Sequence, residues 1–420
     1  MTQQKHPGPE VLAPAGDRER MEMAVRYGAD AVYLAGRQFG MRSAAVNFAP
    51  EDLADSVAWC HARGAKVYVT CNTLPRNDEL TALPAFLETV HDAGADALIM
   101  TDPGVFRMAE QYAPGVPRHV STQAGVVNWA SARMWHDLGA SRVILARELT
   151  LEEIRGIRDH TPKELELEAF VHGSMCVSFS GRCLLSNYMT GRDGNRGECA
   201  QPCRWKYALM EETRPGEYFP VYEDDTGSYI LNSRDLCMID HVPELLACGL
   251  SSLKLEGRMK TAYYAAVISQ AYRKAVDAAV AGEPLDPVWK EEVHRVSHRN
   301  YCTGFYYGRP DPGEYYEDSR YIRDYQVSAV VESVAPEGMT ILSQRNRFCS
   351  GDTLELLIPG EKPISFTVGA MTDAEGTPIT ACPHPKMEVR LRLPAAAPPG
   401  TLLRRCCGEN APHSDNKEPV

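Results

Sequence analysis

Residues 28–34 read GADAVYL, a glycine suited to end a helix followed at once by a short apolar run, and this unit recurs along the chain. Equivalent Gly-Ala pairs stand at residues 64–65, 94–95 and 139–140, each in front of another apolar run. Glycine adopts the left-handed conformation that commonly follows the last turn of a helix. Each pair therefore marks a change from helix to strand, and strands that alternate with helices predict a parallel sheet.

Eight apolar runs of strand length fit this cadence, and eight parallel strands suit a closed TIM-like (β/α) barrel. The predicted strands are Val11–Ala13, Ala31–Leu34, Lys66–Cys71, Ala97–Met100, Arg118–Ser121, Arg142–Leu145, Leu165–Val171 and Ser252–Leu255. Helical patterns lie between most of them, at Arg18–Tyr27, Pro50–Arg63, Glu79–Ala93 and Ser131–Leu138, and a long helix follows at Thr261–Ala281. A doubly wound open sheet is the alternative. However, the first strand is followed by Pro14-Ala15-Gly16-Asp17 rather than G-x-G-x-x-G, with Asp17 placed as a helix N-cap.

The barrel domain is predicted to cover residues 1–310, with a large insertion at about residues 172–250 before the last strand. Residues 311–324 are rich in Tyr, Pro, Gly and charge, which predicts a linker. Residues 325–407 predict a small antiparallel β-barrel domain, and residues 408–420 a disordered tail. The strands expected in the small domain are Val327–Val334, Met339–Leu342, Thr353–Ile358, Ser365–Ala370 and Lys386–Leu393.

Composition and net charge limit the kinds of function that the protein can have. The 420 residues carry a formal net charge of -12, which argues against coating of nucleic acid through bulk charge but allows a local basic patch. No apolar run is long enough to span a membrane, and Met1–Pro9 is too polar for a signal peptide, so we expect a cytoplasmic protein without membrane contact. In a reducing compartment, the 13 cysteines point to metal ligands or catalytic thiols before disulfides.

Four cysteines cluster in the insertion. Cys176, Cys183, Cys199 and Cys203 form C-x6-C-x15-C-x3-C, a set of soft thiolates that suits zinc or an iron–sulfur cluster. The first pair is too widely spaced for a zinc knuckle, which favours the cluster. A redox disulfide pair and buried structural thiols are the alternatives, and Cys237 is an alternative fourth ligand.

Active sites of such barrels lie at the carboxyl ends of the strands. Polar residues expected at these ends are Asn72, Asp102, Gln123, Arg147, Glu148, His172, Lys254, Glu256 and Arg258, and each of them can instead be a helix cap or a loop residue. Arg182 and Arg204 lie in the insertion, where they either form a solvated charged face or receive an anion such as a carboxylate or an RNA phosphate.

A longer motif surrounds the cysteines. Residues 168–176 read EAFVHGSMC and residues 181–186 read GRCLLS, and together they resemble the signature of peptidase family U32. The likeness extends to LAPAG at residues 12–16 and SLKLEGR at residues 252–258, so it covers essentially the whole chain.

The resemblance implies two kinds of activity. The family is named for collagenase-like peptidases, whereas its better-understood members are oxygen-independent hydroxylases with a 4Fe-4S cluster. These act on the wobble uridine of tRNA, a cytidine of ribosomal RNA or a quinone ring. The C-x3-C spacing at Cys199 and Cys203 and the chain length look most like the branch that forms 5-hydroxyuridine in tRNA, with prephenate as the cosubstrate. Cys237 departs from that branch and leaves the fourth ligand open.

These considerations predict a site at the barrel mouth. The four cysteines, or Cys237 in place of Cys203, would hold the cluster. Arg182, Arg204, Lys254, Arg258 and Gln123 would hold a small carboxylate or an RNA phosphate. His172, Glu168 and Glu256 are candidates for proton transfer, although the two glutamates can equally be structural carboxylates paired with Lys254 or Arg258.

Two other function classes compete with the hydroxylase. A peptidase could pair Cys176 with His172, but a thiolate bound to iron is not a free nucleophile, and neither H-E-x-x-H nor G-x-S-x-G occurs in the chain. A non-enzymatic RNA-binding or scaffold protein with a structural cluster is the third class. The expected partners of the hydroxylase are tRNA, a small carboxylate and possible protein partners for oxygen or sulfur chemistry.

Overall fold

The computed structural model describes residues 8–41, 46–176, 180, 183, 185–204, 222–224, 227–229, 234–308, 321–335 and 338–407. The chain divides into two compact units. The first comprises residues 1–25, 29–285 and 299–320, and the second comprises residues 26–28, 286–298 and 321–420. The predicted tail at 408–420 and most of the predicted linker at 311–324 lie outside the described residues.

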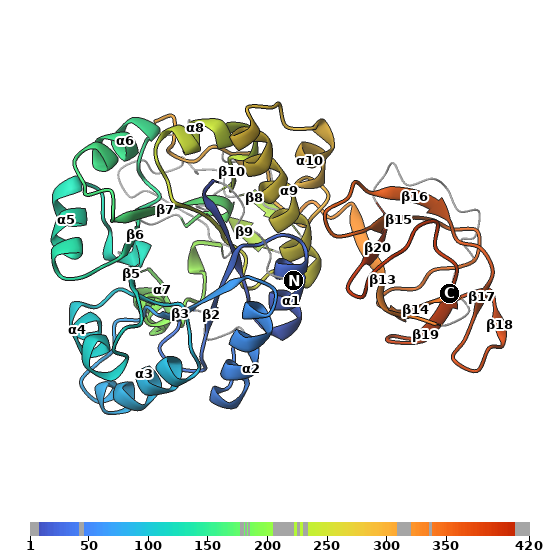
Figure 1. The fold of residues 1–420 in the computed structure, drawn as a ribbon, viewed down its shortest axis with the longest axis horizontal. Coiled ribbons are helices and arrows are strands. Elements are labelled where there is room, and N and C mark those ends of the chain that lie inside the picture. The colour runs from blue at the N-terminus through green and yellow to red at the C-terminus, as the bar shows by residue number, and fades with distance from the viewer. Residues whose placement is uncertain are drawn as a thin grey trace, which may run out of the picture. The chain divides into compact units, whose positions relative to one another are not determined.

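The first unit is built on a closed barrel of eight parallel strands, which confirms the predicted TIM-like fold (Figure 1). The sheet order is β11-β1-β2-β3-β4-β5-β6-β7, and β11 pairs with β7 to close it. The strands are β1 (Glu10–Pro14), β2 (Ala31–Ala35), β3 (Lys66–Cys71), β4 (Ala97–Met100), β5 (Arg118–Val120), β6 (Arg142–Ile144), β7 (Glu166–Ser174) and β11 (Ser252–Leu255).

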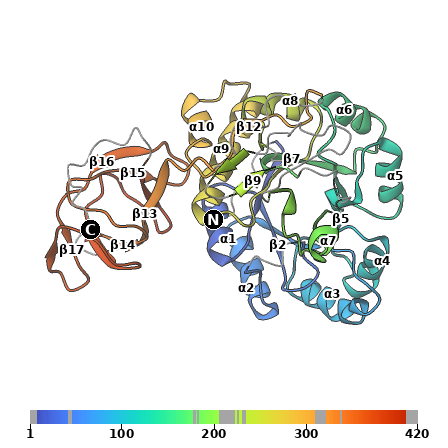
Figure 2. The same cartoon turned by 180° about the vertical axis from the view of Figure 1, so that it is seen from behind.

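Helices surround the barrel, as the view from behind also shows (Figure 2). They are α1 (Arg18–Arg26), α2 (Pro50–His61), α3 (Leu83–Asp92), α4 (Pro103–Tyr112), α5 (Trp129–Asp137), α6 (Leu151–Asp159), α8 (Val242–Ala247) and α9 (Ala262–Ala281), with short 3-10 turns η1 (Glu79–Ala82), η2 (Thr122–Ala124) and η5 (Ile239–His241). Asp17 Oδ1 accepts from the backbone N–H of Arg20, the contact expected of an N-cap at α1. Gly28 and Gly64 have φ values of 100° and 75°, so these glycines take the left-handed conformation that their sequence positions predicted.

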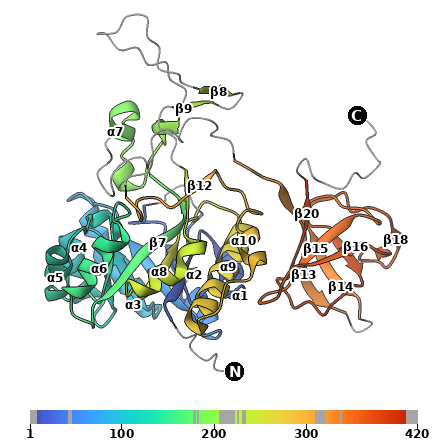
Figure 3. The same cartoon turned by 90° about the horizontal axis from the view of Figure 1, so that it is seen from above.

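The insertion leaves the barrel at the end of β7. It contains α7 (Leu185–Thr190), η3 (Gly194–Arg196), η4 (Pro202–Arg204), β8 (Tyr222–Asp224) and β9 (Gly227–Tyr229). Figure 3 shows α7, β8 and β9 beyond the carboxyl ends of the barrel strands. The chain then returns through β10 (Asp235–Cys237), which pairs antiparallel with β7 and parallel with β12 (Tyr301–Cys302).

The second unit is an antiparallel half-barrel. This agrees with the antiparallel β-domain that the sequence predicted for this region. Its sheet order is β16-β15-β20-β13-β14-β19-β17-β18. The strands are β13 (Tyr325–Val334), β14 (Thr340–Gln344), β15 (Thr353–Leu357), β16 (Ile364–Thr367), β17 (Met371–Thr372), β18 (Pro378–Ile379), β19 (Glu388–Leu391) and β20 (Leu402–Cys406), and the short helix α10 (Pro287–Glu292) belongs to the same unit.

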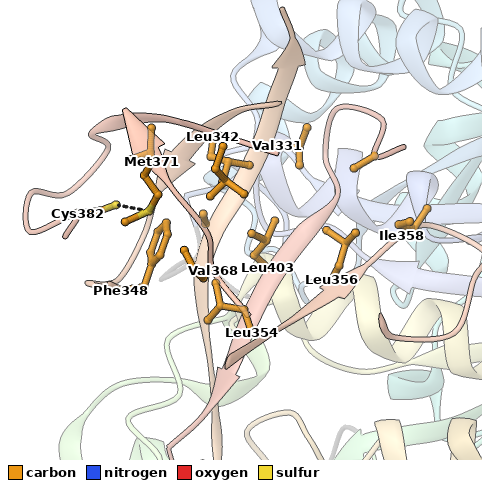
Figure 4. Close-up of a cluster of buried hydrophobic side chains, with 14 residues drawn as sticks. Val331, Leu342, Phe348, Leu354, Leu356, Ile358, Val368, Met371, Cys382 and Leu403 are labelled. Atoms are coloured by element: carbon orange, nitrogen blue, oxygen red, sulfur yellow. Dashed lines mark hydrogen bonds between the residues drawn. The ribbon is translucent and has the colours of Figure 1, made fainter. Parts of the chain in front are cut away.

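The half-barrel encloses its own apolar core. Phe348, Leu354, Leu356 and Leu403 are fully buried there, and Figure 4 shows their side chains in one cluster, with Leu354 and Leu356 from β15, Leu403 from β20 and Phe348 from the segment between β14 and β15. Such a core allows the half-barrel to bury apolar surface within itself. Among the described residues of both units, no helix combines the length and the apolar character needed to cross a membrane.

Candidate active site

Charged side chains from β1, β6, β7 and β11 lie in the barrel interior, which layers of aliphatic side chains usually occupy. Glu168 on β7 is fully buried, and its two carboxylate oxygens accept from Lys254 Nζ and Arg142 Nη1, both at 2.8 Å. Arg142 Nη1 also donates to Glu10 Oε1 at 2.8 Å. We call Glu10, Arg142, Glu168 and Lys254 the barrel-floor network.

Opposite charges keep Glu168 ionised inside the barrel. Burial alone would raise the pKa of Glu168, but Lys254 and Arg142 outweigh it and hold this pKa below its ordinary value. Aromatic rings complete the lining: Lys254 Nζ lies 4.4 Å from the centre of the Tyr33 ring and 5.5 Å from that of Phe170. Glu168 and Lys254 thus satisfy each other inside the barrel, which is the structural pairing that the sequence left open beside proton transfer.

A β-bulge places His172 on a different face of the sheet. Phe170 pairs with Lys254, but the next pair is His172 with Leu255, so one extra residue of β7 interrupts the alternation of faces. His172 is buried and contacts Tyr264 and Tyr272 of α9, the helix that follows β11. Its imidazole therefore does not join Glu168 in the barrel interior.

Two tyrosine hydroxyls set the tautomer of His172. The Tyr272 hydroxyl lies 3.3 Å from Nδ1, and the Tyr301 hydroxyl lies 3.4 Å from Nε2. Tyr272 also donates to the Val171 carbonyl at 2.8 Å, and we therefore assign Nδ1 as the donor to Tyr272. In this tautomer Nε2 accepts from Tyr301, and burial raises the pKa of the Tyr301 hydroxyl well above its ordinary value.

Glu256 and Arg258 follow β11 at the mouth. The Tyr33 hydroxyl lies 3.1 Å from Glu256 Oε2 and 3.0 Å from the Leu255 carbonyl oxygen, so its one proton is shared between these two acceptors. Arg258 is buried, and its Nη2 donates to Asn47 Oδ1 at 2.6 Å. Gln123 lies in η2 after β5 and is half-buried. The mouth therefore carries Glu256, Arg258 and Gln123 on segments that follow two different strands, β11 and β5.

The four insertion cysteines follow β7 at the same mouth. Cys176 and Cys199 are exposed, Cys183 and Cys203 are half-buried, and none of them forms a disulfide. The backbone N–H of Gln201 donates to Cys199 Sγ at 3.4 Å, the kind of contact that stabilises a thiolate.

The thiols suit an iron–sulfur cluster in donor chemistry. Within the described ranges, however, no three His, Cys, Asp or Glu side chains converge on a point that could hold a metal ion, so the geometry does not assemble them. Arg182 and the Arg204 side chain lie outside the described part of the chain.

Cys237, the alternative fourth ligand, lies on β10 directly opposite His172 of β7. Burial raises the pKa of its thiol to about 12, which the Tyr272 hydroxyl opposes. Cys237 therefore lies beside the His172 cluster, by which we mean His172, Tyr264, Tyr272 and Tyr301.

Several residues of the site escaped the sequence reasoning. Arg142 begins a strand and Tyr33 lies within one, so both resembled ordinary strand residues. Tyr272 and Tyr301 lie 100 and 129 residues from His172, too far for any local pattern to connect them. Elements that are distant in sequence supply these contacts, among them helix α9 for Tyr272 and strand β12 for Tyr301, and spacing along the chain does not encode them.

Nearly the whole chain is similar in sequence to known proteins. The model of peptidase family U32 matches residues 16–315, and that of its C-terminal domain matches residues 323–404. The chain is 36% identical over 405 residues to tRNA hydroxylation protein P1 of Bacillus subtilis strain 168, covering 94% of each chain. It is 38% identical to tRNA hydroxylation protein P of Escherichia coli K12, with 92% of this chain and 94% of the relative covered.

A more distant likeness is to a 23S rRNA 5-hydroxycytidine synthase of Escherichia coli K12. Identity is 36% over 271 residues, which cover 64% of this chain and 40% of the relative. All three relatives carry names that refer to RNA hydroxylation.

Proposed function

The chain belongs to peptidase family U32, and on that premise we propose that it is an RNA hydroxylase whose substrate is tRNA. The observation that carries the proposal is the likeness to two tRNA hydroxylation proteins over more than nine-tenths of the chain. Both units take part in that likeness, because 94% of each relative is covered. In its finer form, the product is 5-hydroxyuridine at the wobble position and prephenate is the cosubstrate.

We further propose a 4Fe-4S cluster held by Cys176, Cys183, Cys199 and Cys203, with Cys237 as the alternative to Cys203. When bound, such a cluster supplies one-electron chemistry at thiolate-ligated iron. The support is the donor set: four thiols on one insertion, two of them exposed and none of the four in a disulfide.

The mouth residues have complementary roles in this proposal. Arg258 would hold the carboxylate of the cosubstrate or an RNA phosphate, because a guanidinium matches both groups. Glu256, within hydrogen-bond distance of the Tyr33 hydroxyl, would accept or return a proton at the mouth. Lys254 and Glu168 would support this site from below, since each neutralises the other.

The test begins with anaerobically purified protein. We expect about four irons and four acid-labile sulfides per chain, which is the content of one such cluster. Cys176→Ala should abolish them, whereas Cys407→Ala changes another exposed thiol and should leave them intact. Iron lost from Cys203→Ala or from Cys237→Ala would identify the fourth ligand. Wild-type protein without iron after reconstitution would refute the cluster.

Activity is measured in cells that lack tRNA hydroxylation of their own. Expression of the wild-type chain should restore 5-hydroxyuridine in digested tRNA, and Arg258→Ala should reduce it. Addition of prephenate to a purified reaction tests the cosubstrate, and co-purification tests for a protein partner. Iron-loaded protein that leaves tRNA unmodified would refute the proposal.

A collagenase-like peptidase is the second candidate, favoured by the family name alone. Gelatin cleavage that survives in iron-free protein but is abolished by Cys176→Ala would establish it. If ribosomal RNA or a quinone is hydroxylated and tRNA is not, the chain acts on the substrate of another branch of the family.

A further inference from the structure

Tyr188 on α7 presents an aromatic ring to solvent beyond the barrel mouth. Its exposed fraction is 87%, the largest of any large hydrophobic side chain among the described residues. The next residue, Met189, is 43% exposed. An aromatic ring with so little contact contributes almost no packing energy to the fold, so stability does not explain its position.

The helix that carries Tyr188 is held firmly from its other side. Ser186 is buried, and its Oγ accepts from the backbone N–H of Ala200 at 2.9 Å. Thr190 Oγ1 donates to the Ser186 carbonyl at 2.7 Å. Ala200 follows Cys199 directly, so these contacts tie α7 to the cysteine segment. Tyr188 therefore projects outward from a fixed support close to the proposed cluster.

The insertion is also attached to the barrel. Arg196 Nη2 lies 2.7 Å from Glu79 Oε1 of η1, and the Ser180 backbone N–H donates to Glu148 Oε1 at 3.0 Å. Figure 3 shows α7 standing beyond the carboxyl ends of the barrel strands, where a barrel enzyme receives its substrate.

The segment of sequence that contains Tyr188 has a net charge opposite in sign to that of the whole chain. Residues 180–206 contain five basic residues (Arg182, Arg192, Arg196, Arg204 and Lys206) and two acidic ones (Asp193 and Glu198), whereas the chain has a net charge of -12. A polyanion is therefore attracted to this segment and repelled elsewhere. Exposed aromatic rings among basic residues are typical of surfaces that bind single-stranded nucleic acid.

We propose that Tyr188 is a stacking platform for an unpaired base of the RNA substrate, and that the exposed Arg192, two residues after the end of α7, binds a backbone phosphate. This inference rests on the proposed function and adds the chemical class that the mouth recognises: single-stranded RNA in which a base is available for stacking. RNA loops expose unstacked bases that proteins hold on aromatic rings. Loss of the ring should weaken binding about 5- to 150-fold, the range of one base stacked on an aromatic side chain.

The experiment measures fluorescence anisotropy of two labelled RNAs with iron-loaded full-length protein. One RNA is a hairpin with a seven-nucleotide loop, and the other is a fully paired duplex of the same stem. Tyr188→Ala and Tyr188→Leu should weaken hairpin binding within the stated range, and Tyr188→Phe should bind as the wild type does. Leu138→Ala, which changes an apolar side chain that is 50% exposed after α5, is the matched control and should have no effect.

Tyr188→Trp supplies a direct signal, because a base stacked on the indole should quench its fluorescence when the hairpin is added. Equal hairpin affinity of Tyr188→Ala and wild type would overturn the platform while leaving the proposed function intact. Failure of the wild type itself to bind or modify RNA would instead overturn the proposed function. Weaker binding by Tyr188→Ala that Tyr188→Leu restores would show an apolar contact, such as one to a protein partner, and would also refute stacking.

Discussion

Replacement of Glu168 by leucine tests whether the barrel-floor network is structural. Glu168→Leu removes both acceptors from a fully buried site and leaves the ammonium of Lys254 without its partner at 2.8 Å. Removal of one member of a buried ion pair costs about 3–5 kcal/mol. Loss of the two charge-assisted hydrogen bonds of Glu168, at about 1.5–3 kcal/mol each, gives a similar cost in unfolding free energy.

The double variant Glu168→Leu/Lys254→Met supplies the control. It replaces the pair by apolar side chains of similar length, and such replacements are often neutral or stabilising. Arg142 retains Glu10 and Glu166 as partners in this variant. We therefore expect the double variant to unfold at a denaturant concentration well above that of Glu168→Leu, in urea titrations followed by circular dichroism.

The pH dependence of stability has a definite sign. The pKa of Glu168 in the folded protein lies below its ordinary value of 4.5, so the carboxylate stabilises the fold fully above pH 4.5. This contribution is lost as the pH falls through the lowered pKa. The difference in unfolding free energy between wild type and Glu168→Leu should therefore shrink on acidification.

Two results would contradict this reasoning. A cost below about 1 kcal/mol for Glu168→Leu at pH 7 would mean that the pair does not support the barrel, since a buried unpaired charge costs more. A double variant that folds and retains iron as the wild type does but no longer hydroxylates RNA would mean that Glu168 or Lys254 takes part in the reaction.

Three further predictions concern single contacts. Tyr301→Phe removes the donor to His172 Nε2 and should cost about 1 kcal/mol while changing the imidazole nitrogen shifts in NMR spectra; unchanged shifts would contradict the assigned tautomer. Gly173→Ala should lower the melting temperature more than Gly191→Ala, although both glycines have positive φ. A Cβ at residue 173 would lie 2.3 Å from the carbonyl oxygen of Glu256, whereas a Cβ at residue 191 would have no atom within 4 Å. Arg404→Met should destabilise the half-barrel by about 1.5–3 kcal/mol in calorimetry, since it removes the charge-assisted hydrogen bonds of a buried guanidinium to Glu292 and Glu355 and leaves these glutamates paired with Arg295; an unchanged transition would contradict this.

The barrel was predictable from the sequence because its strands are short, apolar and separated by helix-ending glycines. The predicted strands Lys66–Cys71, Ala97–Met100 and Ser252–Leu255 coincide with β3, β4 and β11 to the residue. These strands are buried almost throughout, and Ala97–Met100 therefore reads as a continuous apolar run. In the half-barrel, β20 escaped prediction because Leu402, Leu403 and Arg404 are all buried, which removes the alternation that identifies a strand.

The site was less predictable because its contacts cross between strands. Lys254 was expected to hold an anion at the mouth, yet it is buried beside Glu168, and this pairing depends on the closure of β7 against β11. The bulge that turns His172 toward α9 has no signature in the sequence beyond Gly173. Residue types at strand ends therefore indicated where the site lies, while the roles of individual side chains depend on register.

The position of His172 bears on the choice between hydroxylase and peptidase. A cysteine peptidase requires an imidazole within hydrogen-bond reach of its thiol and able to take the thiol proton. His172 Nδ1 donates to Tyr272 and Nε2 faces the Tyr301 hydroxyl, and the side chain is buried against α9. Cys176, four residues further along, is exposed to solvent.

For His172 to activate Cys176, the imidazole would have to leave both tyrosines and move out of its buried position, with the loss of two hydrogen bonds of about 1 kcal/mol each. A ligand role for Cys176 does not require this movement, because an exposed thiol needs only to release its proton to solvent when it binds the metal. The same geometry that disfavours a Cys176–His172 dyad is therefore compatible with Cys176 as a cluster ligand, and this asymmetry favours the hydroxylase proposal independently of the names of its relatives.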